Sequence, residues 1–282
     1  ANEYLLFTNG IRDSARHLPT FDAPNAKRVS GRWPNKFWKI ASPFPHSPCR
    51  MPRADTVFLP NLNCLPPLPA HTRLVVTVHD LSFEHFPDLF TVKQRLYHWM
   101  IRPHALLTRA NVIVAVSETT KRDVMETYGI PEEKIHVAYP GIATHPADSG
   151  TKKMKLAVDD APFILSLAEL APRKNLEGLI AAFELFPVLH APFGISLVLA
   201  GVRGSTEQTI RRRIARSPAR NRIHLLGPVT ETEKQTLYAR ATCFAYPSIW
   251  EGFGFPPLDA MAAGIPVVAS TGGSLPEVLG DA

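Results

Sequence analysis

The residues best suited to chemistry lie in the segment 247–264, which reads PSIWEGFGFPPLDAMAAG. Glu251 and Asp259 are its two acidic side chains, and they are eight positions apart. Gly252 and Gly254 follow the first acid and allow a tight loop with close approach of a ligand to the backbone. Because the spacing does not require the two carboxylates to share a face, each can contact a different part of one ligand.

The sequence around these acids predicts a strand, a loop and a helix. An apolar run at 241–246 precedes the loop, and open α/β sheets bind ligands at the carboxyl ends of their strands. Pro256 and Pro257 suit the first turn of a helix. The start of such a helix presents unpaired N–H groups and a partial positive charge, which favour a diphosphate. A second loop with Gly272 and Gly273 is expected at the same sheet edge.

This segment resembles the E-x7-E signature of retaining glycosyltransferase family 4, also called the group 1 glycosyltransferases. The usual form is EGFG-x-P-x-x-EAMA-x-G-x-PV, and the sequence matches nearly every position. The resemblance implies that Glu251 faces the transferred sugar and that Gly252, Phe253 and Gly254 help to bind the nucleotide sugar. Asp259 stands where the family usually has Glu, so its proposed contact with the donor ribose is made by a side chain one methylene shorter.

Two further matches place basic residues and a histidine at the same site. In LAPRKNL at 170–176, the resemblance implies that Arg173 and Lys174 clamp the donor diphosphate and neutralise the leaving group. The alternative is a pair of solvated cations, although cations at a helix N-terminus oppose its dipole. In VVTVHDLSF at 75–83, His79 corresponds to a family histidine that faces the donor sugar. The alternative is a histidine satisfied at the end of a strand.

Weaker matches supply structural and base-binding residues. In VAVSETTKRDV, Ser117 reads as a helix N-cap with Thr120 at the third helical position. The IHLLGPV run at 223–229 resembles the strand and loop that flank the nucleotide base, with Gly227 and Val229 lining that pocket. The glycine pair at 272–273 completes the expected donor-binding set.

Short apolar runs alternate along the chain with amphipathic helical patterns. Near-continuous apolar strands separated by helices indicate parallel sheets covered on both faces. The predicted strands are 4–8, 28–29, 56–59, 74–78, 111–116, 163–167, 195–200, 223–226, 241–246 and 266–269. The predicted helices are 92–108, 118–128, 176–186, 206–215, 231–239 and 256–263.

The resemblance implies an α/β architecture of GT-B type, in which two Rossmann-like domains with parallel sheets face each other across a cleft. The polar stretch 143–160 is the best linker candidate. We therefore expect an acceptor-side domain at 1–145 and a nucleotide-sugar-binding domain at 146–282. Family members carry a Gly-rich loop before the strand at 4–8 and further helices after GDA, so we expect the chain to be truncated at both ends.

Composition narrows the class of partner. A net charge of +6 fits a phosphate-bearing partner, and the RRRIAR run at 211–216 lacks the interleaved aromatic residues of a nucleic-acid patch. Cys49, Cys64 and Cys243 show no metal or disulfide spacing. Their odd number and the apolar surroundings of Cys64 and Cys243 indicate reduced, buried thiols in a cytoplasmic protein. No apolar run is long enough to span a bilayer. The basic balance leaves open a peripheral contact of the N-terminal domain with the inner face of a membrane.

The sequence thus predicts a hexosyltransferase of polysaccharide biosynthesis. It would move a mannose- or glucose-type hexose from a nucleoside diphosphate sugar to a glycan or lipid-linked glycan hydroxyl, with retention. No D-x-D pair is present, and the basic residues can neutralise the diphosphate, so we expect no metal and no cofactor. A GT-B epimerase or phosphorylase and a non-catalytic sugar-nucleotide-binding protein remain alternatives.

Overall fold

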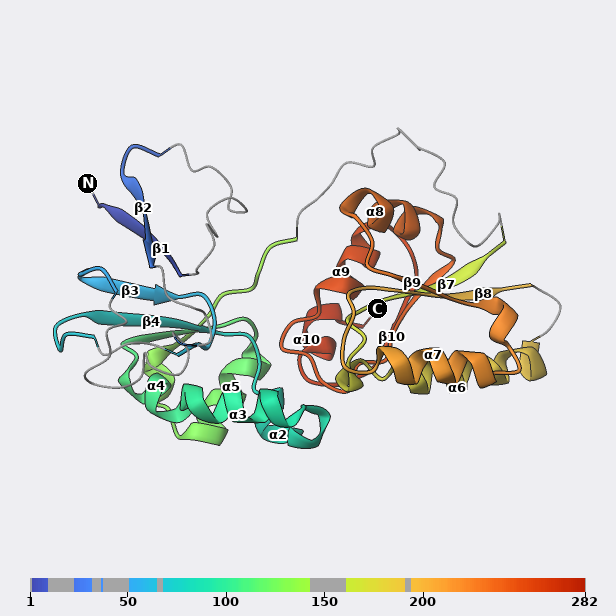
Figure 1. The fold of residues 1–282 in the computed structure, drawn as a ribbon, viewed down its shortest axis with the longest axis horizontal. Coiled ribbons are helices and arrows are strands. Elements are labelled where there is room, and N and C mark those ends of the chain that lie inside the picture. Colours follow the sequence, from blue (N-terminus) through green and yellow to red (C-terminus); the bar gives the residue numbers. More distant parts are fainter. Residues whose placement is uncertain are drawn as a thin grey trace. The chain divides into compact units, whose positions relative to one another are not determined.

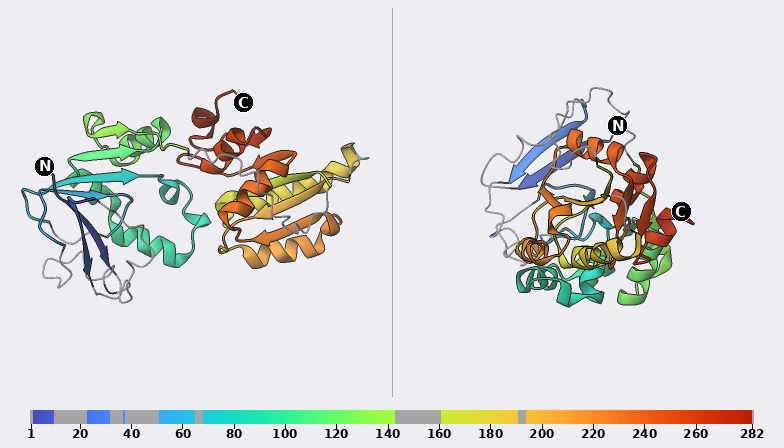
Figure 2. Two further views of the ribbon diagram at one scale, coloured as in Figure 1. Left: turned by 90° about the horizontal axis from the view of Figure 1, so that it is seen from above. Right: turned by 90° about the vertical axis from the view of Figure 1, so that its right-hand side faces the viewer.

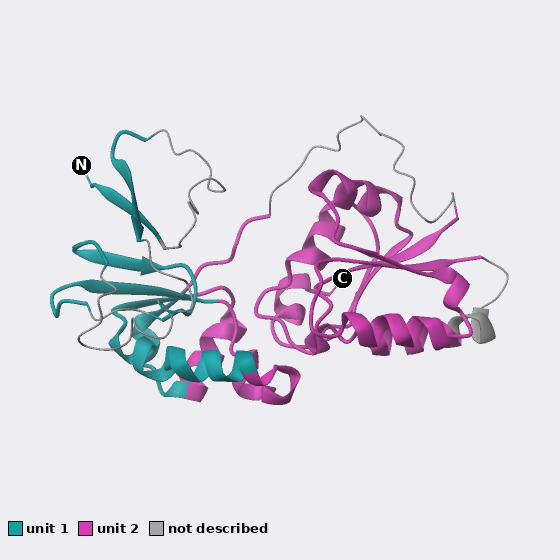
Figure 3. Ribbon diagram, in the orientation of Figure 1, with its two compact units in different colours: residues 1–78, 93–114, 128–136 teal, residues 79–92, 115–127, 137–282 magenta. Residues whose placement is uncertain are grey.

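The structure is a computed structural model that describes residues 2–9, 23–31, 37, 51–64, 68–142, 161–190 and 194–281. The predicted linker at 143–160 and Cys49 lie outside the described residues. The chain divides into two compact units (Figure 3). Unit 1 comprises Ala1–Val78, Lys93–Val114 and Tyr128–His136, and unit 2 comprises His79–Val92, Ala115–Thr127 and Val137–Ala282. Unit 2 therefore takes two segments from the first half of the sequence.

The first half of the sequence forms two sheets (Figure 1). One pairs β1 (Tyr4–Asn9) with β2 (Ala26–Gly31) in parallel. The other has the order β3-β4-β5-β6, and β3 and β4 are parallel. Its strands are β3 (Thr56–Leu59), β4 (Arg73–Val78), β5 (Val112–Ala115) and β6 (Ile135–Val137). The helices of this half are α2 (Ser82–His85), α3 (Val92–Ile101), α4 (Pro103–Arg109) and α5 (Glu118–Tyr128).

The second half forms one five-stranded parallel sheet in the order β11-β10-β7-β8-β9. Its strands are β7 (Phe163–Leu167), β8 (Ser196–Ala200), β9 (Ile223–Gly227), β10 (Cys243–Tyr246) and β11 (Val267–Ala269). Its helices are α6 (Leu176–His190), α7 (Glu207–Arg216), α8 (Glu231–Arg240), α9 (Phe255–Ala262) and α10 (Leu275–Leu279). A capping box of Thr230 and Glu233 starts α8, as the T-x-x-E sequence favours.

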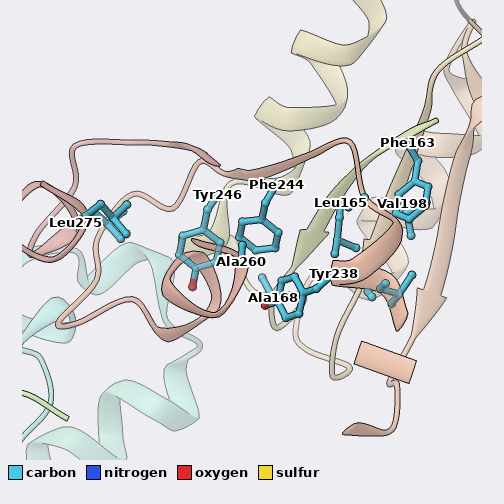
Figure 4. Packing of buried hydrophobic residues seen from close by; sticks show 13 residues of the cluster. Phe163, Leu165, Ala168, Val198, Tyr238, Phe244, Tyr246, Ala260 and Leu275 are labelled. Carbon is cyan, nitrogen blue, oxygen red and sulfur yellow. The ribbon is translucent and has the colours of Figure 1, made fainter. Parts of the chain in front are cut away.

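This sheet is covered by helices on both faces (Figures 1 and 2). Every residue of β8 is buried, and its side chains alternate between two apolar clusters, as the two-residue period of a strand requires. Leu197 and Leu199 pack with α6 and α7. Val198 and Ala200 pack with α8, α9 and α10 in the cluster of Figure 4. The strand β8 therefore lies between the two apolar clusters of this unit.

The structure differs from several local predictions. The helix expected at 92–108 is two helices, because Arg102 adopts a left-handed conformation (φ 53°) before Pro103, whose ring cannot continue the preceding helix. The strand β6 and the helix α10 were not predicted. Cys64 is buried as expected and Cys243 only partly so. Within the described residues, we find no helix with the length and apolar character that a membrane crossing needs.

Candidate active site

A cavity of about 420 Å³ opens where the β strands of unit 2 end. Every residue that lines it belongs to unit 2. The four predicted catalytic residues all contribute to its wall, from the segments that follow β4, β7 and β10 in the sequence. They are His79, Arg173, Lys174 and Glu251. The predicted donor-binding residues Val229, Gly252, Phe253 and Gly254 also line the cavity. The structure therefore brings motifs from both halves of the sequence to one place.

Glu251 is the centre of a buried polar cluster. Its carboxylate Oε2 lies 2.9 Å from Nη1 of Arg173, and its Oε1 accepts hydrogen bonds from Lys174 and Ser248. The hydroxyl of Tyr246 donates to the same Oε1 at 3.0 Å. Glu251 and Lys174 are only 7% and 8% exposed. A charge buried this deeply requires partners, and here one carboxylate satisfies two cations.

The pKa of Glu251 lies below its ordinary value. Burial by itself raises the pKa of this carboxyl, but the opposite charges of Lys174 and Arg173 and the hydrogen bond from Ser248 lower it by more. The carboxylate is therefore ionised at neutral pH. Arg173 and Lys174 together carry one positive charge more than Glu251 neutralises, and Asp80, which also lines the cavity, acts electrostatically on both cations.

The loop that carries Glu251 is fixed by backbone packing against glycines. A Cβ on Gly252 would lie 1.6 Å from the carbonyl oxygen of His79. A Cβ on Gly273, which has φ +65°, would lie 2.2 Å from the carbonyl oxygen of Glu251, and these two residues form a β-bridge. Gly272 is packed in the same way against Ile249. Neither Gly272 nor Gly273 is among the residues that line the cavity, and what the structure shows for them is packing against the loop.

The basic pair reaches Glu251 because its turn is bonded to the acidic loop. Pro172–Lys174 forms a single 3-10 turn, and Asn175 ends it in the left-handed conformation that asparagine tolerates. The carbonyl of Arg173 accepts hydrogen bonds from the amide of Ile249 (2.8 Å) and the hydroxyl of Ser248 (3.2 Å). Backbone hydrogen bonds and side-chain contacts therefore both connect the turn 172–174 to the loop that carries Glu251.

Asp259 occupies a different position from Glu251. Its Oδ2 lies 3.0 Å from Nζ of Lys234, and Lys234 lines the cavity whereas Asp259 does not. Asp259 therefore adjoins the site through Lys234, a residue that the sequence motifs did not single out. Gly227 ends β9 with φ +78°, and its carbonyl accepts the amide of Gly201; it is not among the residues that line the cavity.

A second polar cluster in unit 2 was not predicted. The carboxylate of Glu277 accepts hydrogen bonds from the backbone N–H groups of Glu118 (2.7 Å) and Thr119 (2.8 Å), which start α5. Ser117 accepts the amide of Thr120, which confirms the predicted N-cap, and its hydroxyl donates to the carbonyl of Gly252 at 2.8 Å. An acidic residue beside a helix N-terminus is favourable, and Glu277 connects α10 to α5. Ser117 in turn connects the start of α5 to the loop of Glu251.

Replacing Glu277 with Gln should lower the free energy of unfolding by about 1–2 kcal/mol at pH 7, because charge-assisted hydrogen bonds to helix N–H groups become neutral ones. Burial raises the pKa of Glu277, but the bonds from Glu118 and Thr119 lower it by more. Its contribution is thus complete above the unfolded pKa and is lost as the pH falls through the folded pKa. Urea titrations at several pH values measure this, and equal stability of both proteins at pH 7 would contradict it.

Comparison with known families gives these clusters a context. The family model described as Glycosyl transferases group 1 matches residues 149–282, and the model described as Glycosyltransferase Family 4 matches residues 7–145. The chain belongs to the group 1 glycosyltransferases. Its sequence is 33% identical over 215 residues to O-antigen chain mannosyltransferase B of Escherichia coli, and this alignment covers 74% of this chain and 56% of that protein. The chain thus spans about half the length of the curated relatives it matches.

Solved structures of other glycosyltransferases share the fold. The Anabaena protein HepE in complex with UDP-glucose is 25% identical, with a TM-score of 0.57 over 73% of this chain and 55% of that one. Sucrose-phosphate synthase from Thermosynechococcus elongatus is 16% identical, with a TM-score of 0.65 over 96% of this chain and 72% of that one. These likenesses identify this group 1 glycosyltransferase as an α/β protein of GT-B type, as the sequence predicted.

Proposed function

We propose that this group 1 glycosyltransferase transfers a hexose from a nucleoside diphosphate sugar to an acceptor hydroxyl, with retention of configuration. The observation that carries the proposal is the cluster of Glu251, Arg173 and Lys174 in the wall of one cavity at the carboxyl ends of parallel strands. Arg173 and Lys174 bring two cationic side chains to this wall, and charged donors of this kind bind a diphosphate. The mannosyltransferase relative supports mannose as the sugar, and the complex of HepE supports a nucleoside diphosphate carrier.

Each residue has a role that follows from its position. Arg173 and Lys174 neutralise the charge that develops on the leaving diphosphate, and the N-terminus of α9, which begins after Gly254, adds the partial positive charge of its helix dipole. Pro256 and Pro257 in its first turn carry no backbone N–H. Glu251 and His79 face the same cavity and contact the transferred sugar. The family resemblance favours a front-face route for retention, in which leaving and attacking oxygens share one side of the ring.

A binding and turnover experiment tests the proposal. Calorimetry with GDP-mannose, UDP-glucose, dTDP-glucose and ADP-glucose should show one preferred donor. Arg173→Ala should make the binding free energy of that donor less favourable by about 1.5–3 kcal/mol. The free nucleoside should bind both proteins equally, since it lacks the diphosphate. An epimerised product formed from the donor alone would indicate an epimerase, and cleavage that depends on phosphate would indicate a phosphorylase. Donor binding without turnover on any acceptor would indicate a non-catalytic protein.

Turnover should persist in excess chelator. The basic residues and the N-terminus of α9 supply the positive charge that a divalent cation provides in metal-dependent transferases. The initial rate should therefore be the same in EDTA and in Mg²⁺. A rate that falls in chelator and returns on addition of Mg²⁺ or Mn²⁺ would overturn this part of the proposal.

Asp259→Asn should raise the KM for the donor and leave kcat nearly unchanged. The carboxylate lies away from the reacting bond, beside Lys234, so it contributes equally to binding of substrate and transition state. Asp259→Glu restores the usual family residue and should keep or improve donor binding. Steady-state kinetics with varied donor measure both, and a large fall in kcat with intact donor affinity would contradict the assignment.

A further inference from the structure

Helix α3 carries an exposed apolar stripe. Val92, Leu96 and Trp99 are 80%, 55% and 74% exposed, which is unusual for three large apolar side chains on one short helix. They occupy positions i, i+4 and i+7, so they lie on one face of α3, which Figure 1 labels. Exposed apolar residues that gather on one face mark an interaction site more often than single ones do.

The stripe belongs to a well-anchored helix. Ile101 at the end of α3 is 7% exposed, and it is followed directly by α4, in which Leu107 is fully buried. The exposed side chains therefore do not result from a helix that lacks a core contact. They form the outward face of a helix whose end is anchored in the core.

Basic residues flank the stripe. With 100° between successive residues, Arg95 lies on one side of the line of Leu96 and Trp99, and Lys93 lies on the other. The sequence from 89 to 117 contains no Asp or Glu. It contains the basic residues Lys93, Arg95, Arg102 and Arg109. The segment that carries the apolar stripe is thus basic, and the charge complementary to it is anionic.

We propose that this face of α3 binds an anionic lipid bilayer. An apolar stripe bordered by Lys and Arg is the pattern of helices that lie in the plane of the membrane interface. The ring of Trp99 combines an apolar body with an N–H donor, and such rings settle at the depth of the headgroups. Lys93 and Arg95 then meet the lipid phosphates, while Leu96 and Val92 enter the upper acyl region.

A second copy of the chain fits this face less well. A symmetric dimer through α3 would place the same basic residues of both copies close together, which is unfavourable. Stable protein interfaces also bury at least about 1,200 Å², and three side chains on ten residues of helix fall far short of that area. A bilayer has neither restriction.

Vesicle binding tests the proposal without any sugar substrate. The chain is sedimented with vesicles of phosphatidylcholine alone and with vesicles that contain 30 mol% phosphatidylglycerol, a composition chosen to give about one anionic lipid in three. We expect binding only to the anionic vesicles, decreasing with salt. Leu96→Ser/Trp99→Ser should lower the partition coefficient about tenfold, and Lys93→Gln/Arg95→Gln should lower it by a similar factor.

Leu185→Ser is the matched control, because Leu185 is 62% exposed on α6 and is not part of the stripe. It should bind vesicles as the wild type does, and circular dichroism should show that all variants keep their fold. The proposal is overturned if anionic and neutral vesicles bind equally, if the α3 variants bind like the control, or if sedimentation equilibrium shows a dimer that Trp99→Ser abolishes.

Discussion

Replacement of Lys174 with methionine should lower the free energy of unfolding by about 3 kcal/mol, near the lower end of what is measured when one partner of a buried ion pair is removed. Lys174 is almost fully buried, and its ammonium contacts both Glu251 and the hydroxyl of Tyr246. Methionine fills similar volume but leaves the carboxylate with Arg173 as its one remaining cation. Urea denaturation of the two proteins gives the difference, with the midpoint and slope compared separately.

The double variant Lys174→Met/Glu251→Gln is the decisive control. If the loss comes from an uncompensated buried charge, neutralising Glu251 as well should recover more than half of it, and the two changes should couple strongly. Additive losses would show that Lys174 and Glu251 stabilise the unit independently. Glu184→Gln serves as the reference for an ion pair near the surface, since Glu184 pairs with Arg213 between α6 and α7 and should cost less than about 1 kcal/mol.

The ion pairs of Glu251 with Lys174 and Arg173 predict how the free energy of unfolding depends on pH. The folded pKa of Glu251 is below its ordinary value of 4.5. Its ion pairs therefore contribute fully above that pH, and the contribution is lost as the pH falls through the folded pKa. The stability difference between the wild type and Glu251→Gln should shrink in acid. A difference that stays constant from pH 7 to pH 3 would contradict the lowered pKa.

Glu251→Gln should reduce kcat about 100-fold, in the range seen when one group that stabilises the transition state is removed. Glu251 lines the cavity beside the two cations, and in the proposed reaction this is where charge changes most as the donor bond breaks. The substitution also releases Arg173 and Lys174 from their counter-ion. Binding of the nucleoside diphosphate itself should therefore become tighter, while turnover falls.

This opposite change in affinity and rate separates the role of Glu251 from a general loss of structure. Calorimetry measures affinity for UDP and GDP, and single-turnover kinetics measure the chemical step. Glu184→Gln should change neither, because Glu184 does not line the cavity. If Glu251→Gln weakens nucleoside diphosphate binding and leaves kcat intact, Glu251 acts in donor binding and the proposed division between Glu251 and Asp259 is wrong.

The sequence by itself determined the architecture and the main loop of the site. Strands such as β8 are largely apolar runs, which the sequence shows directly. Pro256 and Pro257 predict the start of α9, and Gly264 predicts its end just beyond Ala262. The loop of Glu251 and the PRKN turn are each formed by consecutive residues, so each pattern is visible without a structure. Residues two to four apart encode these features, and the structure has them close to where they were predicted.

The tertiary structure decided which of these residues meet. Glu251 and Lys174 are 77 positions apart, and Glu277 lies 159 positions from the helix start at Glu118. No local rule relates such positions, because their contact depends on the order of the strands and on the packing of the loops beyond the sheet edge. The sequence predicted two cations for a diphosphate and an acid for a sugar. The structure shows that this acid and these cations form ion pairs with one another, because a buried charge requires a partner of opposite charge.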